Sequence, residues 1–297
     1  MSSQRLFKDQ LASKVMFFLT IFSSLLVVLM AFGLYFRSMP ILSLKPLTEL
    51  LFSTSWRPLK GEFGFFPFLM GTFWVTGVAV AIAIPLCLLT AIYLSEYAHR
   101  RVREWTKPLI DLLAGIPSVV FGVWGTLMIV PLIKDYIAPL WETFSTGYSV
   151  LAGGIVLAIM IFPVIIHVTA EVFRTIPDGM REASLALGAT KWQTVKHVVI
   201  RKALPGIIAA IVLGLSRAFG ETMAVLMVVG NVPKAPSSIL DPAYPLPALI
   251  ANNYGEMLSI PLYDSALLLS AFILLIIVVL FNIISRVILI RVEKRIQ

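Results

Sequence analysis

Two residues of opposite charge, Arg217 and Glu221, lie within the apolar run Ala203–Gly230. An unpaired charge at membrane depth costs roughly 2.5–3.5 kcal/mol on insertion scales, so each charge requires an explanation. Their i, i+4 spacing puts both side chains on one face of a helix, where they can form an ion pair. A guanidinium presents planar, paired donors that suit an oxyanion. The spacing therefore favours an anion site in which Glu221 neutralises Arg217 when the site is empty; a purely structural ion pair is the alternative.

Small residues recur beside this pair at every fourth position. They are Gly206, Ala210, Gly214, Ala218 and Thr222. Small side chains at this spacing let two membrane helices approach closely. The row of Arg217 and Glu221 is one residue away from this stripe. We therefore expect the charged row and Thr222 to flank a helix–helix seam, where a central pathway would run.

The segment Glu171–Lys202 is too polar to cross a membrane, but its pattern is helical. Asp178 suits the N-cap of a helix, and Gly188 suits its end in a left-handed conformation. Thr190 then opens a capping-box pattern with Gln193, which predicts a second short helix. We expect two short helices joined at a glycine on the inner membrane face. A simple amphipathic pair on the membrane surface is the alternative interpretation.

The composition of the whole chain is that of an integral membrane protein. Of its 297 residues, 59% are hydrophobic and 13% charged, with a mean hydropathy of +0.92. A soluble domain is about a quarter charged, so an ordinary cytosolic enzyme is excluded, as is a disordered chain. Cys87 is the single cysteine, so no intrachain disulfide can form. The sequence has no GxxxxGK[ST] loop, no HExxH motif and no metal-ligand spacing, so we expect no nucleotide site of that type, no metal and no cofactor.

Apolar runs predict an all-α fold with six transmembrane helices, each long enough to cross a hydrocarbon core of about 30 Å. The first run is too long for a signal-peptide core and is interpreted as a retained span. The predicted helices are residues 15–36, 69–94, 109–133, 148–170, 203–230 and 263–290. The remaining segments are the N-terminus 1–14, an external loop 37–68, the polar segment 171–202 and the tail 291–297.

The net charge of +8 is explained by membrane topology and not by nucleic-acid binding. Lys and Arg concentrate in the segments that share one side when the N-terminus is placed inside. By the positive-inside rule, both termini are then cytoplasmic and the chain is a multi-pass protein of the plasma or inner membrane.

Prolines mark two kinds of position. The segments 37–68 and 231–262 are rich in proline, which predicts stiff, irregular external loops. These loops are either plain connectors or a docking surface for a soluble partner. Pro117 and Ser118 interrupt the third predicted span, either as a tolerated kink or as a hinge, and are the candidate hinge of the chain.

The residues Glu182, Ala183, Ser184 and Gly188 have a spacing that resembles the EAA loop of ABC-transporter permeases. In that family, this loop carries a coupling helix that fits a cleft on the ATPase subunit. The chain departs from the family pattern at Arg201, where a proline is common. The resemblance implies that these four residues contact an ATPase on another chain, which agrees with the missing phosphate-binding loop.

A longer stretch, Ser216–Val225 followed by Val229-Gly230-Asn231, resembles the signature of PstC-type phosphate ABC-transporter permeases. The stretches 114–118, 122–125 and Gly71-Thr72 agree, and the likeness covers most of residues 71–285. It implies the type I ABC importer permease fold and a non-catalytic permease subunit of an ATP-driven phosphate importer. It also implies a PstA-type partner permease, two ATPase subunits and an external phosphate-binding protein. Arg217, Glu221 and Thr222 would then line the substrate path.

Two other functions stay open at this point. The first is an ABC permease for another oxyanion, such as molybdate, tungstate, sulfate or phosphonate. The second is a self-contained channel or carrier for anions, which would work without an ATPase partner and would leave the Glu182–Gly188 spacing unexplained.

Overall fold

A computed structural model describes residues 3–256 and 260–296, and this part of the chain is mainly helical. It contains six helices that are long and apolar enough to cross a membrane, as the apolar runs predict. The chain is therefore a multi-pass membrane protein. The six helical stretches are Gln10–Leu42, Phe66–Tyr97, Ser118–Leu140, Val150–Arg174, Lys191–Gly220 and Tyr263–Val292.

Helix α8 (Val150–Arg174) is the centre of the bundle and packs between α3 (Phe66–Ile92) and α11 (Ile200–Gly220). Small residues bring these helices together. A Cβ atom added to Gly154 of α8 would lie 2.4 Å from Val78 of α3, and one added to Gly206 of α11 would lie 2.4 Å from Val172 of α8. The predicted seam of small residues on α11 is therefore its contact with α8.

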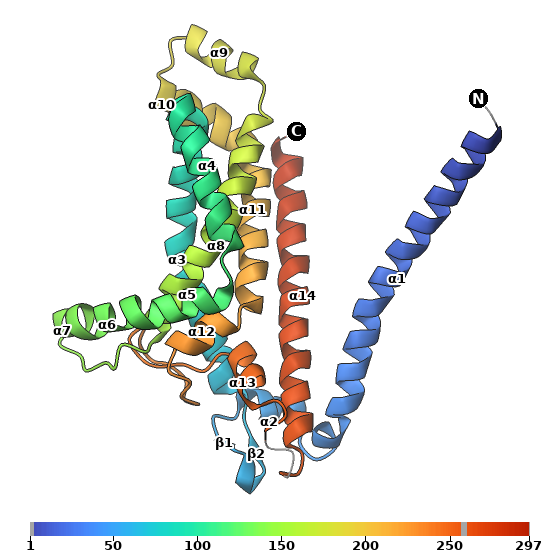
Figure 1. Cartoon of the computed structure of the whole chain (residues 1–297), viewed down its shortest axis with the longest axis vertical. Coiled ribbons are helices and arrows are strands. Elements are labelled where there is room, and N and C mark those ends of the chain that lie inside the picture. The colour runs from blue at the N-terminus through green and yellow to red at the C-terminus, as the bar shows by residue number, and fades with distance from the viewer. Residues whose placement is uncertain (1–2, 257–259, 297) are drawn as a thin grey trace.

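Helix α14 (Tyr263–Ile296) packs on α11, and α1 (Ser3–Leu42) packs on α14. Figure 1 shows that α1 meets the bundle only near its C-terminal end and then leans away from it. The most apolar part of α1 is accordingly not buried at all by the rest of the chain. Helix α1 is also longer than the predicted span 15–36.

The third predicted span, 109–133, is not one helix. Helix α4 (Arg100–Gly115) ends before Ile116, whose backbone is extended at φ −69° and ψ 128°. Proline disfavours a helical residue before it and offers no N–H, so Pro117 stops the helix. A second helical arm then runs away from the bundle (Figure 1). This arm is α5 (Ser118–Trp124), η3 (Gly125–Ile129), α6 (Val130–Leu132), η4 (Ile133–Ile137) and α7 (Ala138–Leu140).

The proline-rich segments are more regular than predicted. They contain α2 (Leu47–Phe52), β1 (Trp56–Arg57), η1 (Pro58–Lys60), β2 (Glu62–Phe63) and α13 (Leu246–Asn253). The strands pair antiparallel, with Trp56 opposite Phe63. The prediction of irregular loops is wrong because several prolines start helices: Pro46 and Pro245 immediately precede α2 and α13, and Pro58 opens η1. Proline suits the first turn of a helix, where its missing N–H would have no partner.

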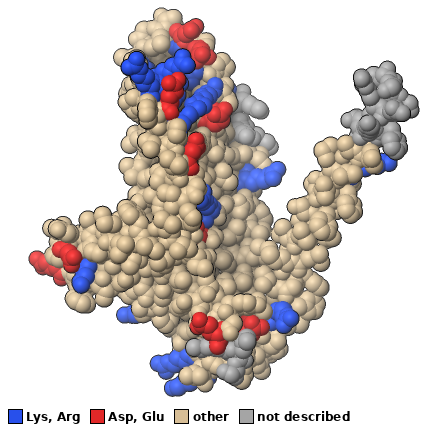
Figure 2. Space-filling model, viewed as in Figure 1, with Lys and Arg blue, Asp and Glu red and all other residues tan. Residues whose placement is uncertain are grey.

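The opposite end of the bundle carries the polar segment. Here α9 (Asp178–Ala186) connects α8 to α10 (Lys191–Thr194), and η5 (Val195–Val199) joins α10 to α11. The wide turn η2 (Tyr93–Tyr97) ends α3 at the same end. Figure 1 places the N-terminal end of α1 and the C-terminal end of α14 toward this end as well. Figure 2 shows Lys and Arg gathered here together with acidic side chains.

Candidate functional site

The candidate path residues lie at a break in the helix. The prediction of one helix over 203–230 is wrong, because α11 ends at Gly220 and a separate helix, α12 (Met223–Val228), follows. Between them, Glu221 has an extended backbone at φ −74° and ψ 126°. Glycine is among the residues that destabilise a helix most, so Gly220 is a favourable place for the helix to stop.

The Glu221 carboxylate is directed at backbone amides of the residues that follow. Its Oε1 atom lies 3.1 Å from the amide nitrogen of Thr222 and 3.5 Å from that of Ala224, so it accepts from the unpaired N–H groups at the start of α12. The predicted ion pair between Glu221 and Arg217 is therefore wrong. The i, i+4 geometry requires a continuous helix, and the chain leaves the helix at Glu221.

Near the break, α11 contacts α8 on one side and α14 on another. Toward α8, a Cβ atom added to Gly214 would lie 2.6 Å from Ile165, so the backbones are in close approach. Toward α14, the Ser216 hydroxyl donates to Asn282 Oδ1 at 3.0 Å.

A third side of α11 faces α3, where the rings of Phe219 and Phe73 meet edge to face with centroids 6.3 Å apart. At about 100° per residue, Leu213 and Arg217 point to the remaining side. Both side chains are exposed, and Leu213 is 51% exposed. Among the side chains that the structure describes, no carboxylate forms an ion pair with Arg217. The guanidinium therefore lies on a side of the helix that this chain leaves open.

Thr222 is half-buried at the same break, and its hydroxyl donates to the Gly220 carbonyl at 3.3 Å. The structure thus places Arg217, Glu221 and Thr222 within two turns of each other. The space behind Glu221, toward Thr72 and Thr76 of α3, is a cavity of only about 10 Å³. This cavity is too small for a phosphate-sized anion, whereas the side of Arg217 is open.

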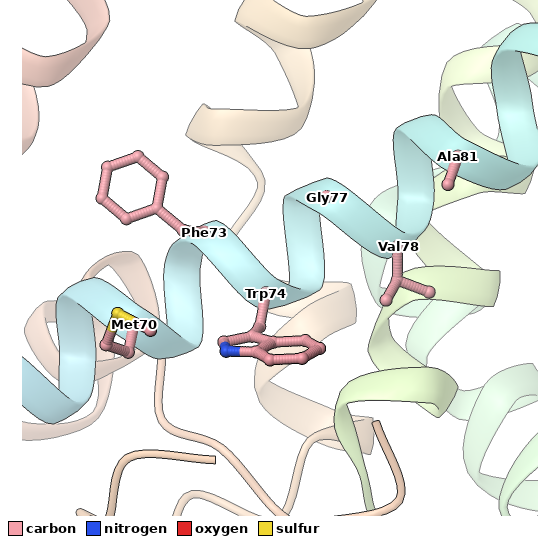
Figure 3. A pocket seen from close by; sticks show the side chains of 6 residues that line it. All are labelled: Met70, Phe73, Trp74, Gly77, Val78 and Ala81. Atoms are coloured by element: carbon pink, nitrogen blue, oxygen red, sulfur yellow. The ribbon is translucent and has the colours of Figure 1, made fainter. Parts of the chain in front are cut away.

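A larger groove of about 370 Å³ runs along α3. Figure 3 shows its lining, with the rings of Phe73 and Trp74 on opposite sides of the ribbon in this view and Gly77 between Trp74 and Val78. All of its lining residues are apolar or glycine: Met70, Phe73, Trp74, Gly77, Val78 and Ala81. An oxyanion needs hydrogen-bond donors or positive charge, so this groove does not suit one.

The signature residues after α12 hold the break in place. Gly230 has φ +89° and Asn231 has φ +52°, and the Asn231 amide donates to the Leu226 carbonyl at 2.8 Å. The Ala243 N–H donates to the Val229 carbonyl at 2.9 Å, which fastens the following loop to the end of α12. These residues therefore fix the short helix that Glu221 caps.

The predicted caps at Gly188 and Thr190 are confirmed, whereas the predicted N-cap at Asp178 is wrong, because Pro177 occupies that position and Asp178 is the first residue of α9. Gly188 has φ +84° just after α9, in the left-handed region that glycine adopts without strain. Thr190 and Gln193 form the capping box, with the Thr190 N–H donating to Gln193 Oε1 at 2.8 Å and the Gln193 N–H donating to Thr190 Oγ1 at 3.3 Å. The expectation of a second short helix is wrong, because the helix that begins at Lys191 continues to Gly220. The residues that start this helix and Arg217 therefore lie on one continuous helical stretch.

Helix α9 presents much of its surface outward. Glu182 and Ala183 are exposed, and no residue of α9 is buried. Leu187, at its end, is 89% exposed. Ser184 points the other way and shares a hydrogen bond of 2.9 Å with Thr194 of α10. An exposed apolar side chain beside small residues leaves α9 free to be covered by another protein.

The sequence analysis missed one connection in this region. Arg181 of α9 forms an ion pair with Glu96 of η2, with 2.8 Å between Arg181 Nη2 and Glu96 Oε1. The hydrogen bond to Glu96 is the main reason why the pKa of Arg181 lies above its ordinary value. The two residues are 85 positions apart, so no local spacing could indicate the pair.

Comparison with known proteins identifies the family. Residues 83–297 match the family model described as "Binding-protein-dependent transport system inner membrane component". The chain is 37% identical over 258 residues to the phosphate transport system permease protein PstC of Xylella fastidiosa (strain 9a5c), covering 82% of this chain and 79% of that protein. It is 33% identical over 252 residues to the probable PstC protein of Methanocaldococcus jannaschii, covering 80% of each.

Two solved structures have the same fold. A bacterial alginate ABC transporter in complex with its oligosaccharide-bound periplasmic protein matches with a TM-score of 0.56 and 16% identity, covering 96% of this chain and 95% of the other. The MetNI methionine ABC transporter matches with a TM-score of 0.55 and 23% identity, covering 77% and 94%. The chain has the fold of a type I ABC importer permease and belongs to the family of binding-protein-dependent transport system inner membrane components.

Proposed function

We propose that the chain is a non-catalytic permease subunit of an ATP-driven phosphate importer. The phosphate transport named for its relatives supports the substrate, and the exposed guanidinium of Arg217 is the observation that carries the proposal. Arg217 lies at a helix break with no described carboxylate paired to it, while Glu221 is occupied by backbone amides. A guanidinium in this situation can donate two parallel hydrogen bonds to a phosphate group.

Glu221 and Thr222 complete the proposed path. The Thr222 hydroxyl can reorient from the Gly220 carbonyl to a passing anion, since a hydroxyl both donates and accepts. The Glu221 carboxylate can accept a hydrogen bond from a protonated phosphate oxygen, which a fully deprotonated sulfate cannot donate. This difference supports phosphate over sulfate as the transported species.

A second permease of the PstA type would form the other wall of the path. The support is the open side of α11: this helix contacts α8, α14 and α3 within the chain, and Leu213 and Arg217 are exposed. Exposing an arginine to lipid at membrane depth costs free energy. A protein surface or a water-filled path opposite Arg217 is therefore favoured.

Two copies of an ATPase on other chains would supply the energy. The exposed residues Glu182 and Ala183, with Ser184 and the bend at Gly188, form the proposed coupling surface. Because the helix that begins at Lys191 runs to Gly220, a displacement of the bundle end that carries α9 can be transmitted along this helix to the break beside Arg217. Pro117 and Ser118, at the break between α4 and α5, remain the candidate hinge for the accompanying motion.

The proposed orientation follows from charge. Lys and Arg gather at the end that carries α9 (Figure 2), which the positive-inside rule assigns to the cytoplasm together with both termini. The opposite end, with the β1–β2 hairpin and the loop that includes α13, would then face outward and receive the phosphate-binding protein.

Reconstitution tests the proposal. Proteoliposomes would contain this chain, the PstA-type permease and the ATPase, and labelled phosphate uptake would be followed with the binding protein present, with and without ATP. We expect ATP-dependent uptake that excess phosphate blocks and that sulfate and molybdate do not. Uptake that is indifferent to ATP would indicate a self-contained carrier, and ATP-dependent uptake of another anion would overturn phosphate as the substrate.

A further inference from the structure

The guanidinium of Arg181 fastens α9 to the end of α3. Its Nη2 and Nε atoms donate to the two carboxylate oxygens of Glu96 at 2.8 and 3.2 Å. Glu96 belongs to η2, the wide turn that ends the helical stretch of α3. Both partners are shielded, since the Arg181 side chain is 18% exposed and the Glu96 side chain 8%. A bidentate pair with this burial fixes the relative position of its two helices more firmly than an exposed pair does.

The same guanidinium also holds the end of α8. It donates to the carbonyl of Ile176 at 2.6 Å and to that of Phe173 at 2.8 Å. The last carbonyls of a helix have no partner within the helix, so Arg181 satisfies groups that α8 leaves free. One side chain therefore joins the coupling helix α9 to both α3 and α8.

Few other contacts position α9. None of its residues is buried, and its described side-chain link to the next helix is the hydrogen bond between Ser184 and Thr194. Apolar packing is therefore not what holds α9 in place, and the polar contacts of Arg181 decide its position relative to the bundle. Helix α3 continues from this point to Phe73, whose ring meets Phe219 next to the break in α11.

We propose that Arg181 and Glu96 are positioning residues that make α9, η2 and the end of α8 move as one body, so that displacement of α9 shifts α3 and α8 along with α11. The inference rests on the proposed function, in which an ATPase displaces α9. Without this connection, α9 would act on α11 through Ser184 and Thr194 and on α8 only through the short segment 175–177, and no side chain of α9 would hold η2 at the end of α3. The two walls of the seam beside Arg217 would then not move together.

The first test measures how many phosphate ions enter per ATP hydrolysed by the reconstituted complex. For Arg181→Ala and Glu96→Gln we expect ATP hydrolysis to continue while uptake per ATP falls about 5- to 150-fold, the size of a typical coupling between sites. Arg181→Lys keeps the charge but loses the paired donors, and should lie in between. Arg100→Ala is the matched control, since Arg100 forms an ion pair with Glu104 at the same end but is 90% exposed.

Unchanged uptake per ATP in both Arg181→Ala and Glu96→Gln would overturn the inference. Loss of ATPase binding in both variants would also overturn it, because the pair would then serve only to fold the coupling surface. Glu96→Gln keeps the shape of the side chain, so it remains informative where Arg181→Ala is too unstable to assemble.

A second test does not depend on which anion is carried. Spin labels at Leu187→Cys on α9 and Leu89→Cys on α3, in a Cys87→Ala background, would report the distance between the two helices with and without ATP. Both label positions are exposed, at 89% and 61%. We expect one narrow distance in every nucleotide state, and a broad or nucleotide-dependent one after Arg181→Ala. The same narrow distance with and without Arg181 would contradict the inference. Failed phosphate uptake by the unmodified complex would contradict only the proposed function.

Discussion

Arg217 and Glu221 lie four residues apart but do not form an ion pair, because Glu221 has left the helix and accepts the N–H of Thr222 at 3.1 Å. The carboxylate thus stabilises the start of α12, and the guanidinium of Arg217 is left on the open side of α11. This separation gives the two residues different tasks, which substitutions can tell apart.

Arg217→Ala should abolish phosphate uptake while the complex still assembles. A charge-assisted hydrogen bond contributes about 1.5–3 kcal/mol, so losing two of them lowers uptake by a hundredfold or more, roughly. Arg217→Lys should restore part of the activity. Uptake at saturating and limiting phosphate is the measurement, and Arg201→Ala, an exposed arginine near the other end of α11, is the control. Full uptake by Arg217→Ala would remove this residue from the path.

Glu221 should show a stability effect that Arg217 does not. Glu221→Ala removes the acceptor for the first N–H groups of α12, and a lost cap costs about 1 kcal/mol. Glu221→Gln keeps a carbonyl acceptor and should melt close to the unmodified chain. A lower uptake by Glu221→Gln at normal stability would assign the charge itself to transport. Equal uptake and stability for Glu221→Gln would limit Glu221 to capping.

Gly188→Ala tests the bend that sets the coupling surface. Gly188 has φ +84° with open space around it, so an added methyl group meets no atom and only the backbone conformation is strained. We expect a cost of about 1 kcal/mol and weaker binding of the ATPase, with Gly188→Asn less affected. Gly179→Ala is a matched control, since Gly179 is in α9, which Gly188 follows, also has open space and does not have a positive φ. Equal ATPase binding by the two alanine variants would contradict this prediction.

The sequence predicted those features that depend on nearby residues. The capping box at Thr190, the left-handed glycine at position 188 and the number of membrane spans come from local signals, and these agree with the structure. The break after Gly220 was missed because the run 203–230 is apolar almost throughout, and periodicity cannot show where a hydrophobic helix is interrupted.

The contacts of Arg181 show a second limit. Its partners Glu96 and Phe173 come from α3 and α8, so the site exists only after the bundle has assembled. In the sequence alone, Arg181 is one of the basic residues that predict the membrane orientation. Tertiary pairing of this kind needs either a structure or covariation between the two positions.

The packing of α11 on α8 predicts a large effect from a small change. A Cβ atom at position 214 would lie 2.6 Å from Ile165, a branched side chain held between two helices, so Gly214→Ala forces the helices apart. Overpacking of this kind costs about 1–3 kcal/mol, which should appear as a lower melting temperature of the purified complex. Gly220→Ala is the comparison, because its added methyl group meets no atom within 4 Å. Equal melting temperatures for the two variants would mean that the seam is looser than its geometry indicates.

The loop after α12 should loosen in acid. Asp241 Oδ2 accepts hydrogen bonds from the Ser237 hydroxyl at 2.7 Å and from the N–H groups of Ser237 and Ser238 at 2.9 Å each. These bonds, the Ser237 hydroxyl first, hold the pKa of Asp241 below its ordinary value. A lowered pKa in the folded state means that the stabilisation is complete above the ordinary carboxyl pKa of about 3.9 and is lost as pH falls below it.

Amide hydrogen exchange of the loop 231–245, compared at matched exchange times between neutral pH and the lower limit of sample stability, measures this effect. We expect protection of the Ser237 and Ser238 amides to fall as the pH drops below about 4, once the intrinsic pH dependence of exchange is removed. Asp241→Asn carries no titrating carboxylate, so its loop should be less protected at neutral pH and should show no further loss in acid. An acid-induced loss of the same size in Asp241→Asn would assign the transition to another group and leave Asp241 without a role in it.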